Sequence, residues 1–203
     1  MATGRPREFD VDERLDLAMR VFWEHGYEGA GLAELTEAMG ISRPSLYAAY
    51  GNKETLFRRA VERYADGPAR HIREALLKPT ARAAAEHLLR GAVEVTTSAE
   101  NPSAGCLVVQ GALATSSQAD GIREELAARR HTGEERLRER FELARQEGEL
   151  PDDTDAAALA RYITTVSYGI SVQASSGATR EDLHRTVTLA LLAWPSHTQG
   201  PQR

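Results

Sequence analysis

The sequence contains one cysteine, Cys106, among 203 residues. A single cysteine excludes an intramolecular disulfide and any zinc cluster built on cysteines. Cys106 lies in the apolar run CLVV, which favours a role as a small buried hydrophobic residue over a role as a redox sensor. The six histidines lack the spacing of metal ligands, so we predict neither a metal site nor another cofactor.

Long apolar segments and strand patterns are also missing. No run of 18 or more apolar residues occurs, and the N-terminus lacks an apolar signal segment, so we expect a soluble cytoplasmic protein with no membrane partner. No segment alternates between apolar and polar residues in the manner of a strand. A hydrophobic content of 41%, rich in Ala and Leu, instead favours a folded, all-α protein.

The net charge of −5 is unusual for a nucleic-acid-binding protein. However, no acidic residue occurs between Met39 and Lys53, and this stretch contains Arg43. The N-terminal arm adds Arg5 and Arg7, which could lie along DNA, although such arms are more often simply disordered. The local charge therefore permits contacts with phosphates, with modest non-specific affinity.

The segment LAELTEAMGISRPSLYAAYGNK, residues 32–53, predicts two short helices joined by a tight turn. Gly40 can adopt the left-handed backbone that ends the first helix, and Ser42 can cap the second. Leu46 and Tyr50 are expected to face inward, which leaves an outer surface suited to a DNA major groove. That surface comprises Arg43, Pro44, Ser45, Tyr47 and Ala48.

The rest of the chain predicts further helices, about nine in all. A helix from Asp10 to Gly26 supplies the third element that the helix pair needs, and another, capped by Asn52, runs to a break at Gly67 and Pro68. We therefore predict a helix-turn-helix domain over residues 7–67, a ligand-sensing and dimerisation domain over 68–195, and a disordered tail over 196–203. Later helices are predicted at residues 69–78, 80–98, 105–117, 120–147, 153–175 and 179–194.

The last two predicted helices are apolar on more than one side, and such helices need more than one neighbour. A second subunit could supply it, because two helices from each chain make a four-helix, two-fold interface. The alternative is a central helix pair inside a monomer. The predicted interface residues are Leu159, Ile163, Val166, Ile170, Leu183, Val187, Ala190 and Trp194.

The N-terminal third resembles the tetracycline-repressor (TetR) family of bacterial transcriptional regulators. The resemblance rests on the segments FWEHGYEG, at residues 22–29, and LAELTEAMGISRPSLYAAYGNKETLF, at residues 32–57. It covers residues 7–67 by motif, and beyond them only helix order and length support it. The most specific positions are Gly40, Ile41, Ser42, Leu46, Tyr47, Tyr50, Lys53 and Glu54.

The resemblance implies roles for single residues of the helix pair. Residues 32–39 would form the positioning helix and residues 42–50 the recognition helix, with base-edge and phosphate contacts from Arg43, Pro44 and Ser45. Tyr47 would place its hydroxyl on a phosphate, and Lys53 would neutralise another. The chain departs from the family at Ala30, Gly31 and Ala49, where a capping residue and an aromatic or His are usual.

The resemblance also implies that a small molecule binds among the middle helices and changes the separation of two recognition helices in a homodimer. Polar groups within apolar helices are the candidate ligand contacts, although each is individually more typical of a core or interface residue. These candidates are His71, His87, Gln110, Tyr162 and Tyr168.

The function predicted from these features is a ligand-responsive repressor that binds a palindromic DNA operator as a homodimer. Two functions of other classes are possible. A helical enzyme is disfavoured, because no nucleophile with a base, no paired carboxylates and no glycine-rich phosphate loop stand out. A helical adaptor that has kept the fold but lost DNA binding is favoured by the negative net charge and by the departures at Ala30, Gly31 and Ala49.

Overall fold

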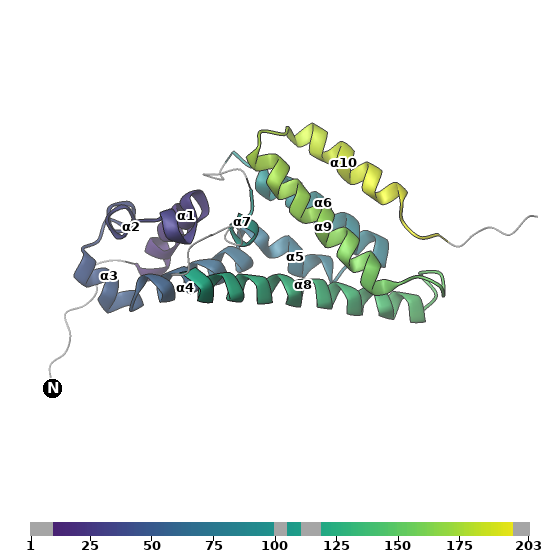
Figure 1. The fold of residues 1–203 in the computed structure, drawn as a ribbon, viewed down its shortest axis with the longest axis horizontal. Helices are drawn as coiled ribbons and strands as arrows, with labels where there is room; N and C mark the ends of the chain where they lie inside the picture. The colour runs from purple at the N-terminus through teal and green to yellow at the C-terminus, as the bar shows by residue number, and fades with distance from the viewer. Residues whose placement is uncertain (1–9, 100–104, 111–118, 197–203) are drawn as a thin grey trace, which may run out of the picture.

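The computed structural model describes residues 10–99, 105–110 and 119–196 (Figure 1). Within these ranges it contains ten α-helices, one 3-10 helix and no strand, which confirms the predicted all-α class and is close to the nine or so helices expected. The elements are α1 (Val11–Gly29), α2 (Leu32–Met39), α3 (Arg43–Tyr50), α4 (Lys53–Asp66), η1 (Pro68–Arg70), α5 (His71–Ala75), α6 (Ala81–Thr96), α7 (Leu107–Gln110), α8 (Asp120–Gln146), α9 (Ala156–Ser175) and α10 (Arg180–Leu192).

The predicted helix starts are confirmed by their side-chain caps. Asp10 accepts hydrogen bonds from the backbone N–H groups of residues 12 and 13, at 2.9 and 3.4 Å. Asn52 caps α4 at 2.7 Å, and Thr80 caps α6 at 3.1 Å. Each cap satisfies an N–H group that has no partner inside its own helix, so these starts are fixed by local sequence alone.

Two glycines behave differently from each other. Gly26 takes a φ of 68° and interrupts α1, after which a short helical segment continues to Gly29. Gly133 lies inside a continuous α8 and does not interrupt it. The helix predicted at residues 105–117 is described only from 105 to 110, where α7 forms, and the predicted tail lies outside the described residues except for Ser196.

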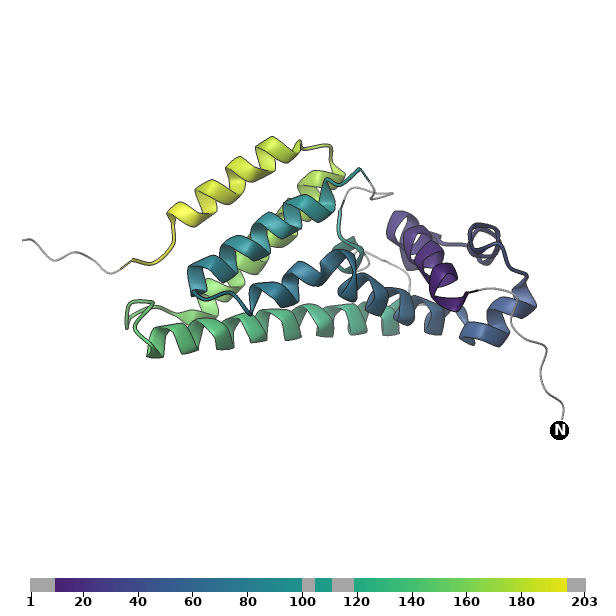
Figure 2. The same ribbon diagram turned by 180° about the vertical axis from the view of Figure 1, so that it is seen from behind.

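The helices surround two hydrophobic cores. The first fills the space between α1, α2, α3 and α4 and also receives Leu107, Ile122 and Leu126 from α7 and the start of α8. The second lies between α5, α6, α8, α9 and α10. Figures 1 and 2 show α8 running along the helices of the second core, with its start beside the end of α4. The break at residues 67 and 68 therefore divides the chain into α1 to α4 and the helices that follow. It does not divide the packing as cleanly, because α7 and the start of α8 contribute to the first core.

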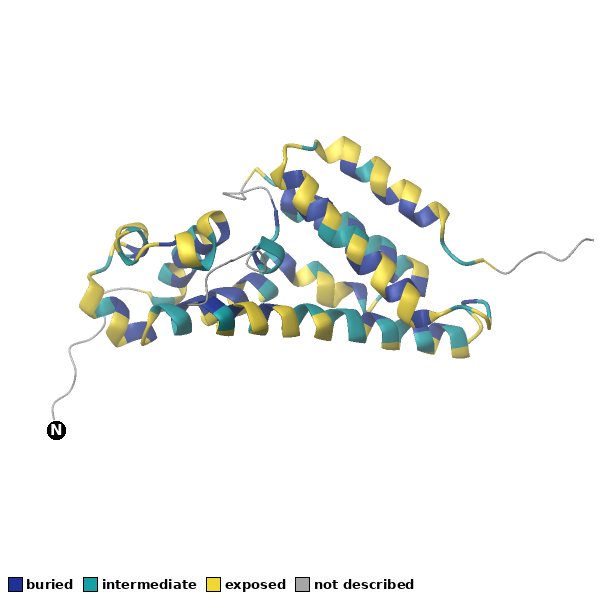
Figure 3. Ribbon diagram, viewed as in Figure 1, coloured by how far each residue is buried: buried dark blue, intermediate teal, exposed yellow. Residues whose placement is uncertain are grey.

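The residues predicted for the dimer interface lie on the inner faces of α9 and α10. Six of these eight residues are buried in the second core of their own chain, and Val166 and Trp194 pack partly buried against it. The reason is that α6 and α8 cover the inner face of α9, and α6 and α9 cover that of α10. The exposed faces of the two helices are visible in Figure 3 and carry other large hydrophobic residues, namely Tyr162, Val172, Leu189 and Leu192.

None of the described helices combines the length and the apolar character that crossing a lipid bilayer requires.

Candidate DNA interface and central cavity

The turn between α2 and α3 has the geometry that the sequence predicts. Gly40 lies in the left-handed region, with φ of 61° and ψ of 34°, and its N–H group bonds back to α2. The Ser42 hydroxyl then accepts a hydrogen bond from the N–H group of Ser45 at 3.3 Å and caps α3. Because a residue with a side chain rarely adopts this conformation, Gly40 sets the angle at which α3 leaves α2.

Helix α3 is anchored from its inner side. Leu46, Ala49 and Tyr50 are buried in the first core, and the Tyr50 hydroxyl donates a hydrogen bond to the carbonyl of Val11, the first residue of α1, at 2.8 Å. The anchor leaves the opposite side of α3 in solvent. The exposed residues of α3 are Arg43, Pro44, Tyr47 and Ala48, with 46% of Tyr47 accessible.

The side chains of Ser42 and Ser45 are hydrogen-bonded to each other. Besides the capping bond, their hydroxyl oxygens lie 2.9 Å apart and share a hydrogen bond. Ser45 is half-buried, whereas Ser42 is exposed. Ser42 is therefore a cap in the first place, and a contact from Ser45 to DNA would have to compete with this pair.

Lys53 is held against an aromatic ring. Its ammonium nitrogen lies 4.8 Å from the centroid of Tyr27, a cation–π distance, and burial lowers the pKa of Lys53 from its ordinary value. Tyr27 was not among the predicted site residues, although it lies in the FWEHGYEG segment. A phosphate contact by Lys53 would therefore come from a position prepared by Tyr27.

Two further predictions concern the N-cap of α2 and the N-terminal arm. Gly31 is the N-cap residue of α2 and makes no side-chain cap, in keeping with the departure seen in the sequence. A side chain at Gly31 would meet open space and a φ of −69°, so the position tolerates other residues. The arm residues Arg5 and Arg7 lie outside the described part of the chain.

A cavity of about 550 Å³ lies between α4, α5, the α7 segment, α8 and α9. It exists because α8 turns small side chains toward it, at Ala128, Thr132 and Gly133, and a Cβ added at Gly133 would meet no atom within 4 Å. This volume is within the usual range for a small-molecule site. Cys106, which is half-buried, also lines this cavity.

The five predicted ligand residues do not come together. Only Tyr168 lines the central cavity, where burial raises its pKa. Gln110 packs closely against Gly105, and the ring of His87 lies 3.2 Å from a carboxylate oxygen of Glu74.

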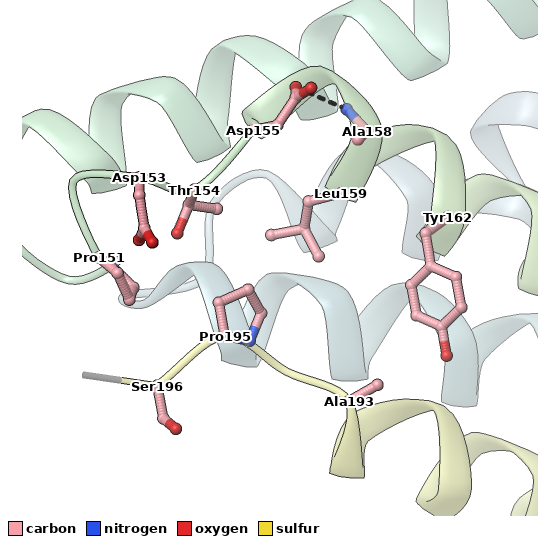
Figure 4. Close-up of a pocket in the computed structure, with 10 residues that line it drawn as sticks. All are labelled: Pro151, Asp153, Thr154, Asp155, Ala158, Leu159, Tyr162, Ala193, Pro195 and Ser196. Atoms are coloured by element: carbon pink, nitrogen blue, oxygen red, sulfur yellow. Dashed lines mark hydrogen bonds between the residues drawn. The ribbon is translucent and has the colours of Figure 1, made fainter. Parts of the chain in front are cut away.

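Tyr162 lines a separate hollow of about 500 Å³ between the start of α9 and the segment after α10 (Figure 4). Its hydroxyl donates a hydrogen bond to the carbonyl of Ala190 at 3.3 Å. Tyr162 therefore links α9 to α10 and takes no part in the central cavity. The sequence pattern identified polar residues within apolar helices, but it carried no information on which of them share a cavity.

His71 lies in another groove, between α1, η1, α5 and α6. Its ring is pressed against α6 at Gly91, where an added Cβ would lie 2.4 Å from the ring. Burial lowers the pKa of His71 to about 4, so the ring is neutral near pH 7. His71 is therefore a packing residue of the α5–α6 contact.

Two polar links join the cavity walls to the first four helices. Trp23 of α1 donates a hydrogen bond from its indole N–H to the carbonyl of Gly105, next to Cys106, at 3.0 Å. On the other side, Arg58 of α4 pairs with Glu125 of α8 at 2.7 Å, and Glu125 also pairs with Arg129. Burial raises the pKa of Glu125, but the hydrogen bonds from the two arginines outweigh it and lower the pKa overall.

Two family models match this chain. The model described as "Bacterial regulatory proteins, tetR family" matches residues 15–60, and that described as "Tetracyclin repressor-like, C-terminal domain" matches residues 81–190. Among curated proteins, the chain is similar to the HTH-type transcriptional repressor ComR of Escherichia coli, with 36% identity over 95% of this chain and 92% of ComR. It is 31% identical to the uncharacterized HTH-type transcriptional regulator YezE of Bacillus subtilis, over 93% of this chain and 99% of YezE.

Solved structures give the same result. A cysteine-substituted variant of the TetR-family regulator CifR, in complex with a 26-base-pair operator DNA, is 47% identical and superimposes with a TM-score of 0.89 over 94% of this chain and 100% of the CifR chain. A TetR-type regulator from Rhodococcus is 41% identical, with a TM-score of 0.64 over 91% of this chain and 99% of that chain.

Proposed function

Because this chain belongs to the TetR family of bacterial transcriptional regulators, we propose that it is a repressor that binds a palindromic operator as a homodimer and is released by a small-molecule effector. The observation that carries the proposal is α3, whose polar and aromatic outer face stands in solvent while Tyr50 and the Ser42 cap fix its direction. A relative with the same fold binds operator DNA, which supports the same role here.

The DNA contacts follow from the exposed side of α3. Arg43 can donate two hydrogen bonds to a guanine edge in the major groove, and the ring of Pro44 can pack on a thymine methyl group. Tyr47 is placed to donate to a phosphate, and Lys53, over the ring of Tyr27, to neutralise another. Base recognition is thus assigned to the first turn of α3, and affinity to the residues around it.

The dimer forms through the outer faces of α9 and α10. Tyr162, Val172, Leu189 and Leu192 leave large apolar side chains in solvent there, with Leu189 66% and Leu192 75% accessible. Pairing these faces about a two-fold axis would bury them and set the two copies of α3 at the separation of successive major grooves, about 34 Å.

The effector binds in the central cavity. The walls of the cavity are tied to α1 by the Trp23–Gly105 hydrogen bond and to α4 by the Arg58–Glu125 ion pair. A ligand that prefers a different spacing of these walls shifts the population toward a dimer whose two α3 helices no longer fit the operator.

Selection of binding sites from random duplex DNA with the purified chain tests the DNA-binding part. We expect a palindromic site, whose affinity falls steeply as salt concentration rises. An absence of any selected site would contradict the proposal and would favour an adaptor that has lost DNA binding.

Arg43→Ala tests base recognition. We expect a loss of about 1–3 kcal/mol of discrimination at one or two base positions, with the fold intact. Tyr47→Phe should weaken binding to all sequences alike, because it removes a phosphate contact. Arg82→Ala, at an exposed position on α6, is the control. Fluorescence anisotropy on a set of single-base operator variants measures both effects, and an unchanged operator preference in Arg43→Ala would refute its role.

Leu189→Glu tests the dimer. A charge on this face should give monomers that fold but bind the operator weakly, because a single α3 lacks the second half-site contact. Leu77→Glu introduces the same charge at another strongly exposed leucine, between α5 and α6, and should leave the dimer intact. Sedimentation velocity separates these outcomes, and a dimeric Leu189→Glu would count against this interface.

A further inference from the structure

The wall of the central cavity carries an excess of positive charge. Four arginines and one carboxylate line it in the part of the chain that the structure describes. The carboxylate belongs to Glu125, which already accepts hydrogen bonds from Arg58 of α4 and Arg129 of α8. The two arginines therefore neutralise its charge, and Glu125 offers little attraction to a cationic ligand. The four arginines are Arg73, Arg129, Arg130 and Arg136.

Two of these arginines have donors to spare. Arg130 uses one guanidinium nitrogen to bond the carbonyl of Val108 at 2.9 Å and makes no other hydrogen bond within the described residues. Arg136 is exposed and forms neither a hydrogen bond nor an ion pair among the described residues. Arg73, in contrast, pairs with Asp66 at 2.7 Å. Because a guanidinium carries five N–H donors, Arg130 and Arg136 can both bind an added anion.

Arg130 and Arg136 flank the open part of the α8 surface. Gly133 lies three residues from each of them along the helix, and all three residues line the same cavity. The space above Gly133 is empty, since a Cβ there would meet nothing within 4 Å. The Tyr168 hydroxyl, on the facing wall formed by α9, adds a further hydrogen-bond donor. A planar anionic group would find donors from both walls.

The rest of the cavity is apolar. Side chains from α4, α5, α6 and the α7 segment form this portion, and its one charged group, Arg73 of α5, already pairs with Asp66. A ligand that fills the cavity therefore needs an apolar body as well as an anionic group. The main apolar residues are Val61, Ile72, Leu76, Leu88, Val108 and Val109.

We propose that the central cavity binds an amphipathic organic anion, with a carboxylate or similar group between Arg130 and Arg136 and an apolar chain or ring against α4, α5 and α6. The inference rests on the proposed function in one respect, namely that this anion would be the effector that releases the operator. Binding itself depends on the cavity and can be measured without DNA.

Matched ligand pairs test the anionic part. We would titrate the full-length protein by calorimetry with octanoate and 4-phenylbutyrate, and with the primary amide of each, which keeps the apolar body and removes the charge. Each carboxylate should bind at least about tenfold more tightly than its amide, the usual effect of a charge-assisted hydrogen bond. Equal binding of carboxylate and amide, or no binding of either carboxylate, would overturn the proposal.

A variant locates the site. Arg136→Gln should weaken carboxylate binding about tenfold and leave amide binding unchanged, which also shows that the cavity is intact. Arg138→Gln is the matched control, because Arg138 lies on the same helix, pairs with Glu135 at 2.6 Å and does not line the cavity. Unchanged carboxylate affinity in Arg136→Gln would place the anion elsewhere and overturn the proposal.

Operator release is measured separately. Adding the same carboxylates to the protein–operator complex should release the DNA for the wild type and require about tenfold more ligand for Arg136→Gln. If the carboxylates bind as predicted and the DNA stays bound, the anion site stands and the proposed release mechanism fails.

Discussion

The helices at the DNA-binding end and those around the cavity bury apolar surface in different ways. At the DNA-binding end aromatic rings fill the core. Phe22 and Phe57 pack edge to face with centroids 5.0 Å apart, and Trp23 and Tyr64 do so at 4.7 Å. Around the cavity, α8 presents alanine, threonine and glycine, and an open volume of about 550 Å³ remains.

This difference matches what each region has to do. Interlocked rings hold α1 against α4, and Tyr50 anchors α3 to α1. Recognition of base edges tolerates little displacement of α3. A cavity lined by small side chains costs stability but leaves room for a ligand to change the spacing of the helices around it. The two regions meet at Trp23, which belongs to the aromatic core and also donates a hydrogen bond to Gly105, the residue before the cavity-lining Cys106.

The largest expected difference in the free energy of unfolding between the two regions comes from two leucine truncations. Leu56→Ala, in the fully packed first core, should lower the free energy of unfolding by about 4 kcal/mol. Leu88→Ala, on the cavity wall, should cost only about 2 kcal/mol, because that side chain already borders empty space. Urea unfolding at equal protein concentration measures both. Equal losses would show that the cavity wall is as tightly packed as the DNA-binding end.

Acid should destabilise the junction between the two regions through His71. Burial lowers the pKa of the folded ring to about 4, whereas the unfolded ring has its ordinary value of 6.5, so the unfolded chain binds the proton more readily. Stability is therefore complete above about pH 7.5 and falls by on the order of 2 kcal/mol as the pH drops to about 5. In His71→Gln the difference between unfolding free energies at these two pH values should be smaller. An identical fall in both proteins would assign the acid sensitivity to other groups.

The contact of His71 with Gly91 gives a smaller effect. Gly91→Ala would place a methyl group 2.4 Å from the His71 ring and force α5 and α6 apart. After the gain in helix propensity, the net loss should be about 1–2 kcal/mol. His71→Ala removes the clashing ring, so the double variant should be more stable than the sum of the single effects. Strictly additive free energies would mean that the two positions are not in contact.

Gly133→Ala has the smallest expected effect, and it should be a gain. The glycine lies inside a regular helix with open space beside it, so alanine should stabilise the protein by about 0.5–1 kcal/mol. Operator affinity should stay the same, because the change is confined to the cavity region. A loss of stability in thermal unfolding would show that the position is more crowded than the structure indicates.

The local features of the helix-turn-helix could be predicted because each depends on a few neighbouring residues. The caps at Asp10, Ser42 and Asn52, and the left-handed turn at Gly40, all follow from side chains or backbone preferences within three or four positions. The exposure of Arg43 and Tyr47 followed from the same short pattern.

The cavity and the free faces of the last two helices could not be predicted in this way. A helix that is apolar on several sides has to be buried on more than one of them, but its sequence does not say which side meets its own chain. Here α6 and α8 cover Ile163 and Ile170 and leave Tyr162 and Val172 in solvent.

The sequence by itself determined the all-α class, the helix-turn-helix and its outward-facing residues, because helix periodicity and capping are local properties. Only the tertiary structure decided that Arg130, Arg136 and Tyr168 share one cavity while His71 and Tyr162 lie outside it. The physical reason is that a cavity is made where helices distant in the chain fail to fill the space between them, and that depends on how all of them pack together.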